Sequence, residues 1–190
     1  MAKTKKAARK KTAPLDGIQP EEAARVLKCL LAIHPALVPE AEEIWRLSLA
    51  EVSFETVAFD VESAILSLDL DDFNDRAGSH SWGYVEPSEA AIELLREAVA
   101  PFREEMSRKM ELGLNEAAFE TCKGIVFGLY QCKNSTGGDL LSWAPDFPVE
   151  AASDTACELN NFCKLGASFN FGEFVDDCVP EWQWLAGPAG

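Results

Sequence analysis

Four prolines, each followed within two residues by an acidic side chain, set the architecture of this chain. They are Pro20, Pro39, Pro87 and Pro148, in the segments PEEAARVL, PEAEEIW, PSEAAIELL and PVEAA. A proline in the first turn of a helix costs no hydrogen bond, and carboxylates there interact favourably with the positive end of the helix dipole. Sustained alternation of apolar and polar residues is confined to SFNFGEF at 168–174. The sequence therefore predicts an all-α fold.

Apolar residues spaced three or four positions apart extend these starts into a series of helices. One such stripe joins Leu27, Leu30, Leu31 and His34. Pro101 is expected to kink or break the helical stretch near Ala100, because its ring clashes with the preceding turn. Short connections favour antiparallel neighbours, in an α-solenoid-like stack or an irregular helical bundle. The predicted helices cover roughly residues 20–34, 39–51, 53–68, 70–77, 87–100, 101–112, 115–133, 139–144 and 148–165.

Charge is divided unevenly along the chain. The net charge is -15, but six of the 17 basic residues fall in the first 12 positions, which hold no acidic residue. The rest of the chain therefore carries 11 basic and 32 acidic side chains, a net charge of -21. We expect residues 1–17 to form a disordered basic arm, because they lack periodicity and are poor in large apolar side chains. Residues 18–190 are expected to form a single acidic helical domain.

The basic arm has two interpretations. Its cations can bind nucleic-acid phosphates or an acidic partner, or they can act as a solubilising tail that folds back transiently over the acidic body. No aromatic residue lies between the cations, so little binding specificity is expected and the second interpretation is favoured. The residues concerned are Lys3, Lys5, Lys6, Arg9, Lys10 and Lys11.

Composition predicts a cytoplasmic protein with reduced cysteines. The N-terminus lacks the apolar segment of a secretory signal, and no apolar run reaches the roughly 18 residues that span a bilayer. The six cysteines form no C-x-x-C pair, and only His34 and His80 are available to complete a zinc site. We therefore expect no cofactor, and we interpret the cysteines as buried free thiols.

The segment LDLDDFNDRAGSH, residues 68–80, concentrates carboxylates. Its spacing does not fit an EF-hand calcium loop, because Phe73 falls at a ligand position in either register. A magnesium ion needs only one or two protein carboxylates. A metal site formed by Asp71, Asp72, Asp75 and His80 is therefore one interpretation of this segment.

A structural interpretation of the same segment accounts for more of its residues. Asp69 or Asp71 would cap a short helix, and Asp72 would pair with Arg76 one turn later. Gly78 would end this helix in the left-handed conformation. We favour this interpretation over the metal site.

Aromatic side chains near the middle and the end of the chain provide candidate binding residues. His80, Trp82 and Tyr84 lie in the polar segment SHSWGY, and Trp182 and Trp184 lie in the C-terminal segment PEWQWLAGPAG. His80 could act as a general base, but a hydrogen bond to the backbone is the favoured interpretation. Rings of this kind either anchor interfaces or fill gaps between helices. We expect the C-terminal segment to pack back on the helices.

Two glycines, Gly124 and Gly128, lie four residues apart within a predicted helix. Each costs about 1 kcal/mol relative to alanine, so close approach of a neighbouring helix is expected there. Neither phosphate-binding glycine motif is present, and the chain also lacks G-x-S-x-G and H-E-x-x-H. We therefore assign no catalytic residue.

The segments LDLDDFNDRAG, GYVEPSEAA, AVAPF and GIVFGLYQC, within residues 68–132, are similar to a group of uncharacterised bacterial all-helical proteins. Helical regions that accompany SWIM-type zinc fingers in bacteria are also similar. The chain lacks the Cys-x-Cys and Cys-x-His pairs of that finger. The resemblance therefore implies a helical domain and transfers no activity, zinc site or nucleic-acid role.

These observations favour a non-catalytic protein–protein interaction or adaptor domain, whose acidic helical surface binds a basic protein partner. Two alternatives stay open. One is a metal-dependent enzyme or ligand-binding protein that uses residues 71–80. The other is a nucleic-acid-associated protein that uses the basic arm. No membrane partner is expected.

Overall fold

The computed structural model describes residues 17–81, 83–134, 139–163 and 169–186. Within them lie eight α-helices, one two-stranded hairpin and short 3-10 turns, so the fold is all-α, as the sequence predicts. The basic arm with its six cationic residues lies outside the described residues, as does Trp82. The chain divides between Trp45 and Arg46 into two compact units, at a position where the sequence analysis placed no boundary.

The first unit consists of helices joined by a turn. α1 (Pro20–Ile33) starts with the predicted proline, and the N–H of Gln19 donates to Oε2 of Glu22 at 3.1 Å. The 3-10 turn η2 (Pro35–Leu37) leads into α2 (Val38–Ala50), whose last residues belong to the second unit. No residue of these three elements is buried.

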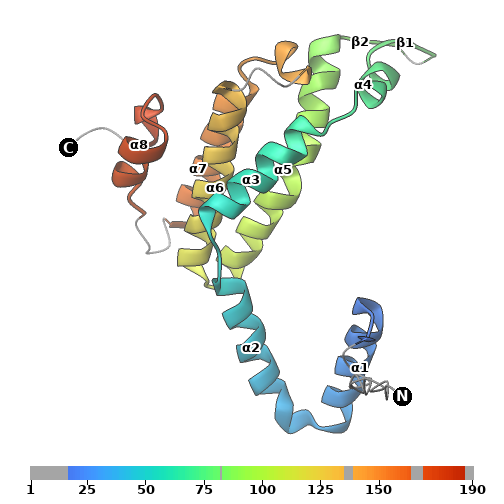
Figure 1. Cartoon of the computed structure of the whole chain (residues 1–190), viewed down its shortest axis with the longest axis vertical. Coiled ribbons are helices and arrows are strands. Elements are labelled where there is room, and N and C mark those ends of the chain that lie inside the picture. The colour runs from blue at the N-terminus through green and yellow to red at the C-terminus, as the bar shows by residue number, and fades with distance from the viewer. Residues whose placement is uncertain (1–16, 82, 135–138, 164–168, 187–190) are drawn as a thin grey trace, which may run out of the picture. The chain divides into compact units, whose positions relative to one another are not determined.

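α6 (Asn115–Asn134) is the central helix of the second unit. Three helices pack against α6: α3 (Phe54–Leu66), α5 (Pro87–Glu111) and α7 (Phe147–Cys163) (Figure 1). The arrangement is an irregular helical bundle. Its core includes the fully buried side chains of Val61, Leu95, Val99, Ile125, Val126, Leu129 and Leu159.

Shorter elements complete the second unit. They are α4 (Leu70–Arg76), the hairpin strands β1 (Gly78–His80) and β2 (Gly83–Val85), the 3-10 turns η3 (Leu140–Ser142) and η4 (Gln183–Ala186), and α8 (Gly172–Cys178). The residues Phe171, Phe174, Val175, Val179 and Trp182 belong to the buried core. In the described part of the C-terminal segment, Trp182 and Leu185 are buried in this core, and residues 187–190 lie outside the described residues.

The two glycines of α6 allow α3 to lie against it. A Cβ atom at Gly124 would lie 2.5 Å from Cβ of Val57, and a Cβ atom at Gly128 would lie 2.6 Å from the carbonyl oxygen of Ala58. Side chains do not tolerate such distances, since carbon atoms in contact prefer about 3.5–4.0 Å. The predicted close approach of a helix is confirmed.

α5 continues through Pro101 as one helix, so the predicted break, with separate helices at 87–100 and 101–112, is wrong. The buried side chains of Val99 and Met106 lie on either side of the proline and both belong to the core. Packing along this continuous stripe offsets the roughly 3 kcal/mol that an interior proline costs. Pro101 itself is exposed, as is Glu97, whose carbonyl lacks the usual N–H partner and can bond water instead.

Two short elements were not predicted. β1 and β2 pair antiparallel, with Ser79 opposite Tyr84, but three-residue strands are too short to produce visible alternation. α8 begins at Gly172, inside the segment 168–174 whose alternation resembled a strand. Phe171, the residue that caps α8, and Phe174 and Val175 within it are buried and follow helical spacing instead.

Lys109 of α5 is buried between helices, with 5% of its surface exposed. Its Nζ donates to Oγ1 of Thr121 on α6 at 2.9 Å and lies 3.6 Å from Oε1 of Glu105. The Thr121 hydroxyl donates in turn to the carbonyl oxygen of Ala117 at 2.8 Å. Burial lowers the pKa of Lys109, and the nearby carboxylate of Glu105 only partly opposes this effect.

Lys123 of α6 lies among phenylalanine rings from three helices. Its Nζ is 5.1 Å from the ring centroid of Phe54 on α3, 5.2 Å from Phe119 on α6 and 6.0 Å from Phe174 on α8. The same group pairs with Glu120. Because a cation is attracted to the face of an aromatic ring, Lys123 helps to hold α8 and α3 on α6.

Candidate interaction surfaces

The aspartate segment forms the start of α4. Oδ1 of Asp69 accepts a hydrogen bond from the N–H of Asp71 at 2.9 Å, which confirms one of the two predicted caps. Gly78 has φ of +100°, in the left-handed region that the prediction required after the helix. Asp71, Asp72 and Asp75 are exposed. Among the described residues, no three His, Cys, Asp or Glu side chains form a group that could hold a metal ion.

Arg76 pairs with a different residue from the one predicted. Its Nη1 and Nη2 donate to Oε1 and Oε2 of Glu97, each at 2.7 Å, whereas Asp72 had been predicted as the partner. Glu97 offers both oxygens in a plane, and this matches the fork of donors on a guanidinium group. The hydrogen bond to Glu97 raises the pKa of Arg76 and lowers that of Glu97. The pair fastens α4 to α5.

His80 bonds to the backbone, as the sequence analysis favoured. Its Nε2 lies 2.8 Å from the carbonyl oxygen of Arg76. A carbonyl oxygen only accepts, so Nε2 carries the proton and donates it. His80 lies in β1, and Tyr84 in β2 is 61% exposed. Of the three residues predicted in this segment, Tyr84 therefore has the ring available to a partner, while Trp82 lies outside the described residues.

The two C-terminal tryptophans differ in exposure. Trp182 is 2% exposed and packs edge-on against Tyr130 of α6, with ring centroids 5.2 Å apart. Trp184 is 44% exposed, and its ring centroid lies 6.0 Å from that of Trp182. Trp182 is therefore part of the core, and Trp184 is the residue of this pair that a partner can reach.

A cleft of about 480 Å³ lies between α5 and α7. Three arginines and five carboxylates line it, together with apolar residues such as Val99 and Phe147. The cleft could not be predicted from the sequence, because its opposite sides are contributed by residues as far apart as Arg103 and Glu158, 55 positions from each other.

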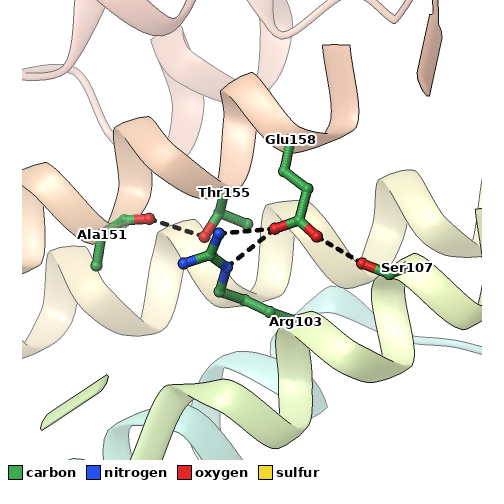
Figure 2. A network of polar contacts seen from close by, with 5 residues as sticks. All are labelled: Arg103, Ser107, Ala151, Thr155 and Glu158. Atoms are coloured by element: carbon green, nitrogen blue, oxygen red, sulfur yellow. Dashed lines mark hydrogen bonds and ion pairs between the residues drawn. The ribbon is translucent and has the colours of Figure 1, made fainter. Parts of the chain in front are cut away.

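One polar network joins α5 to α7 at this cleft (Figure 2). Oε2 of Glu158 accepts from Nε and Nη2 of Arg103 at 3.0 and 2.7 Å, and its Oε1 accepts from the hydroxyl of Ser107 at 2.6 Å. On α7 the hydroxyl of Thr155 donates to the carbonyl oxygen of Ala151 at 2.7 Å. Both carboxylate oxygens of Glu158 are thus used within the network. We interpret it as a structural link between the two helices.

The first unit carries the most concentrated exposed apolar surface in the described residues. On α1, exposed fractions are 50% for Val26, 43% for Leu30 and 70% for Ile33. These positions follow the i, i+4, i+7 spacing of one helix face. We define the α1–α2 apolar surface by this row and four further exposed residues: Val26, Leu27, Leu30, Ile33, Leu37, Ile44 and Trp45.

A shallow groove of about 360 Å³ runs along α1 within this surface. Val26, Leu30 and Ile33 line it, with Arg25 and the exposed Cys29 at its edge. Exposure of Cys29 contradicts the interpretation of all cysteines as buried, and Cys157 of α7 is also exposed. Cys122 and Cys132 are buried, as expected.

Acidic residues predominate among the charged residues of the segment that carries the α1–α2 apolar surface. Described residues 17–45 contain five glutamates and two basic residues, and none of these seven side chains forms an ion pair within the described part of the chain. The glutamates are Glu21, Glu22, Glu40, Glu42 and Glu43, and the basic residues are Arg25 and Lys28.

The apolar spacing in the sequence predicted the stripe of α1 but not its exposure. Leu27 and Leu30 are half exposed and His34 is exposed, although amphipathic spacing is more often a sign of core packing. Spacing identifies an apolar face, and it does not identify what covers that face. Only the structure shows that no element of the first unit buries it.

Comparisons with known proteins supply no relative for this chain. No family model, no curated protein and no solved structure matches it. The similarity of residues 68–132 to bacterial helical proteins therefore stays a prediction. Within the described residues, no helix combines the length and apolar character needed to cross a bilayer.

Proposed function

We propose that this chain is a non-catalytic protein–protein interaction or adaptor module, which binds its partner through the α1–α2 apolar surface. The observation that carries the proposal is the exposure of seven large apolar side chains on α1, η2 and α2, three elements that contain no buried residue. Short helices are marginal in water and owe their stability to burial of an apolar face. Contiguous apolar patches on a protein surface mark interaction sites.

The size of the α1–α2 apolar surface is compatible with a regulated interaction. Complete burial of one large apolar side chain contributes about 1.5–3 kcal/mol, so each half-exposed residue offers roughly 1 kcal/mol and seven offer roughly 7 kcal/mol. Association itself costs an estimated 4–15 kcal/mol. Apolar contacts alone would therefore give weak binding, and charged or aromatic contacts must supply the rest.

Other exposed groups provide such contacts. Tyr84 and Trp184 are the exposed members of the predicted aromatic anchors, and aromatic residues frequently dominate interface energetics. The acidic body, with a net charge of -21 over residues 13–190, favours a basic partner. The composition predicts that this interaction takes place in the cytoplasm.

Alkylation of Cys29 tests the proposal, because this exposed thiol lies at the groove of α1. The rate of Cys29 modification is measured by mass spectrometry in purified, diluted protein and in an extract of cells that naturally contain the chain. The exposed thiol of Cys157 in the same molecules is the internal reference. A partner on the α1–α2 apolar surface should slow Cys29 at least tenfold in the extract and leave Cys157 unchanged. Equal Cys29 rates in both samples refute the proposal.

A further inference from the structure

From the shape and charge of the α1–α2 apolar surface, we infer that its partner is an amphipathic helix with basic residues beside its apolar face. This inference rests on the proposed function and specifies the class of partner. Its first basis is shape. Val26, Leu30 and Ile33 form a straight apolar row along one groove of α1. Rows spaced i, i+4 and i+7 pack against the matching row of another helix.

The second basis is charge. Residues 17–45, which carry the surface, contain five glutamates and two basic residues, and all seven lack an ion-pair partner among the described residues. Interfaces favour complementary potentials, and like charges brought together reduce affinity. A partner with lysine or arginine along the edges of its apolar face satisfies the unpaired carboxylates. A neutral or acidic helix does not.

Two other occupants fit these observations less well. A second copy of the chain brings another net charge of -15, including the same five glutamates, to the interface. The chain's own basic arm matches in charge, but residues 2–13 contain no leucine, isoleucine, valine or aromatic residue that could fill an apolar groove. An amphipathic helix with basic flanks is the occupant that supplies both properties.

Two designed peptides test the inference with the full chain. One is an 18-residue amphipathic helix of leucine and lysine, and the other has the same leucine positions with glutamate in place of lysine. Each is added at micromolar concentration while Cys29 and Cys157 are alkylated in the same sample. The lysine peptide should slow Cys29 at least tenfold without affecting Cys157, and the glutamate peptide should change Cys29 less than twofold. Added salt should weaken the protection, because part of the attraction is electrostatic.

Matched variants locate the site. Leu30→Ser should abolish the protection of Cys29, whereas Phe59→Ser, which alters a 66% exposed phenylalanine of α3, should retain it. Both residues are exposed, so circular dichroism should show an unchanged helical fold. Charge reversal at Glu42 and Glu43 to lysine should shift the preference toward the glutamate peptide. Equal protection by both peptides overturns the charge argument, as does a charge-reversed chain that still prefers the lysine peptide.

Further outcomes separate this inference from the proposed function. If neither peptide protects Cys29 but the natural extract does, the partner class is wrong and the proposed function stands. If protection grows with the concentration of the chain alone, the occupant is a second copy and the inference is overturned. If Cys29 is slow at every dilution without any addition, the surface is covered within one chain, and both proposals fail.

Discussion

Substitution of Gly124 by alanine places one methyl group where α3 and α6 are closest. The new Cβ would lie 2.5 Å from Cβ of Val57 and 2.7 Å from the carbonyl oxygen of Phe54. The side chain of Val57 can rotate, but its Cβ and the backbone of α3 cannot move away independently. The whole helix must therefore shift outward by about 1 Å to reach ordinary contact distances.

Two opposing effects decide the change in the free energy of unfolding. Alanine in place of glycine inside a helix contributes about 1 kcal/mol of stability. Overpacking of a well-packed core costs about 1–3 kcal/mol and occasionally more. A shift of α3 also loosens Val61 and Ile65, which are buried on the same helix. We assign the upper part of that range and expect Gly124→Ala to destabilise the protein by about 2 kcal/mol.

The second glycine provides a stricter test. Gly128→Ala also pushes α3 outward, because its Cβ would lie 2.6 Å from the carbonyl oxygen of Ala58. A shift caused by the first alanine makes room for the second. The double variant should therefore lose less stability than the two single losses together, as expected for sites that share one displacement.

Urea unfolding followed by circular dichroism measures these changes in the free energy of unfolding. Gly17→Ala serves as a control, because a Cβ atom there meets open space, and it should change stability by less than about 0.5 kcal/mol. The reasoning is refuted if Gly124→Ala raises stability by about 1 kcal/mol. In that case only helix propensity acts, and α3 does not lie as close to α6 as described.

Three further predictions concern charged and thiol groups in the second unit. Lys109→Met should leave the free energy of unfolding unchanged or raise it by up to about 2 kcal/mol, because it removes a buried charge and retains most of the volume. Folding lowers the pKa of Lys109 below 10.5, so the unfolded wild type binds more protons than the folded protein. The free energy of unfolding of the wild type should therefore rise relative to that of the variant as pH increases toward 10.5. A difference between the two proteins that stays constant with pH in urea unfolding would contradict this. Lys123→Met should lower the free energy of unfolding by about 1–2 kcal/mol, because the attraction between the cation and the rings is lost. Lys133→Met, which removes an exposed ion pair, should lower it by less than about 0.5 kcal/mol. Equal decreases in the melting temperature of the two variants would count against the ring contacts. Burial raises the pKa of Cys132 to about 12, so at pH 8 alkylation detected by mass spectrometry should modify Cys29 rapidly and Cys132 only after unfolding.

Local rules in the sequence were sufficient for much of the fold. Prolines with neighbouring carboxylates placed the starts of α1 and α5 correctly, and Ser53 caps α3 by accepting from the N–H of Thr56. The spacing of Gly124 and Gly128 predicted a close helix contact. The helix starts and caps depend on interactions within one or two turns, which are visible in a single stretch of sequence. The glycine spacing predicted a close contact but did not identify α3 as the neighbouring helix.

Features that depend on distant residues were not predictable. The continuity of α5 through Pro101 requires the core that α5 shares with α6. The guanidinium group of Arg76 pairs with Glu97, although Asp72 is closer to it in the sequence. The cleft between α5 and α7 and the exposure of the α1 stripe likewise depend on which helices become neighbours. Periodicity reports an apolar or charged face, and tertiary packing decides its partner.

The central position of α6 also affects the order of events during synthesis. α3 is complete at Leu66, but the helix that covers it ends at Asn134. Translation at about 5–20 residues per second needs roughly 3–14 seconds for the intervening stretch. During that interval the buried residues of α3, Ala58, Val61 and Ile65, lack the complete α6, the helix against which α3 packs most extensively. The nascent chain thus exposes an apolar helix for seconds, and this is the period in which ribosome-associated chaperones would bind it.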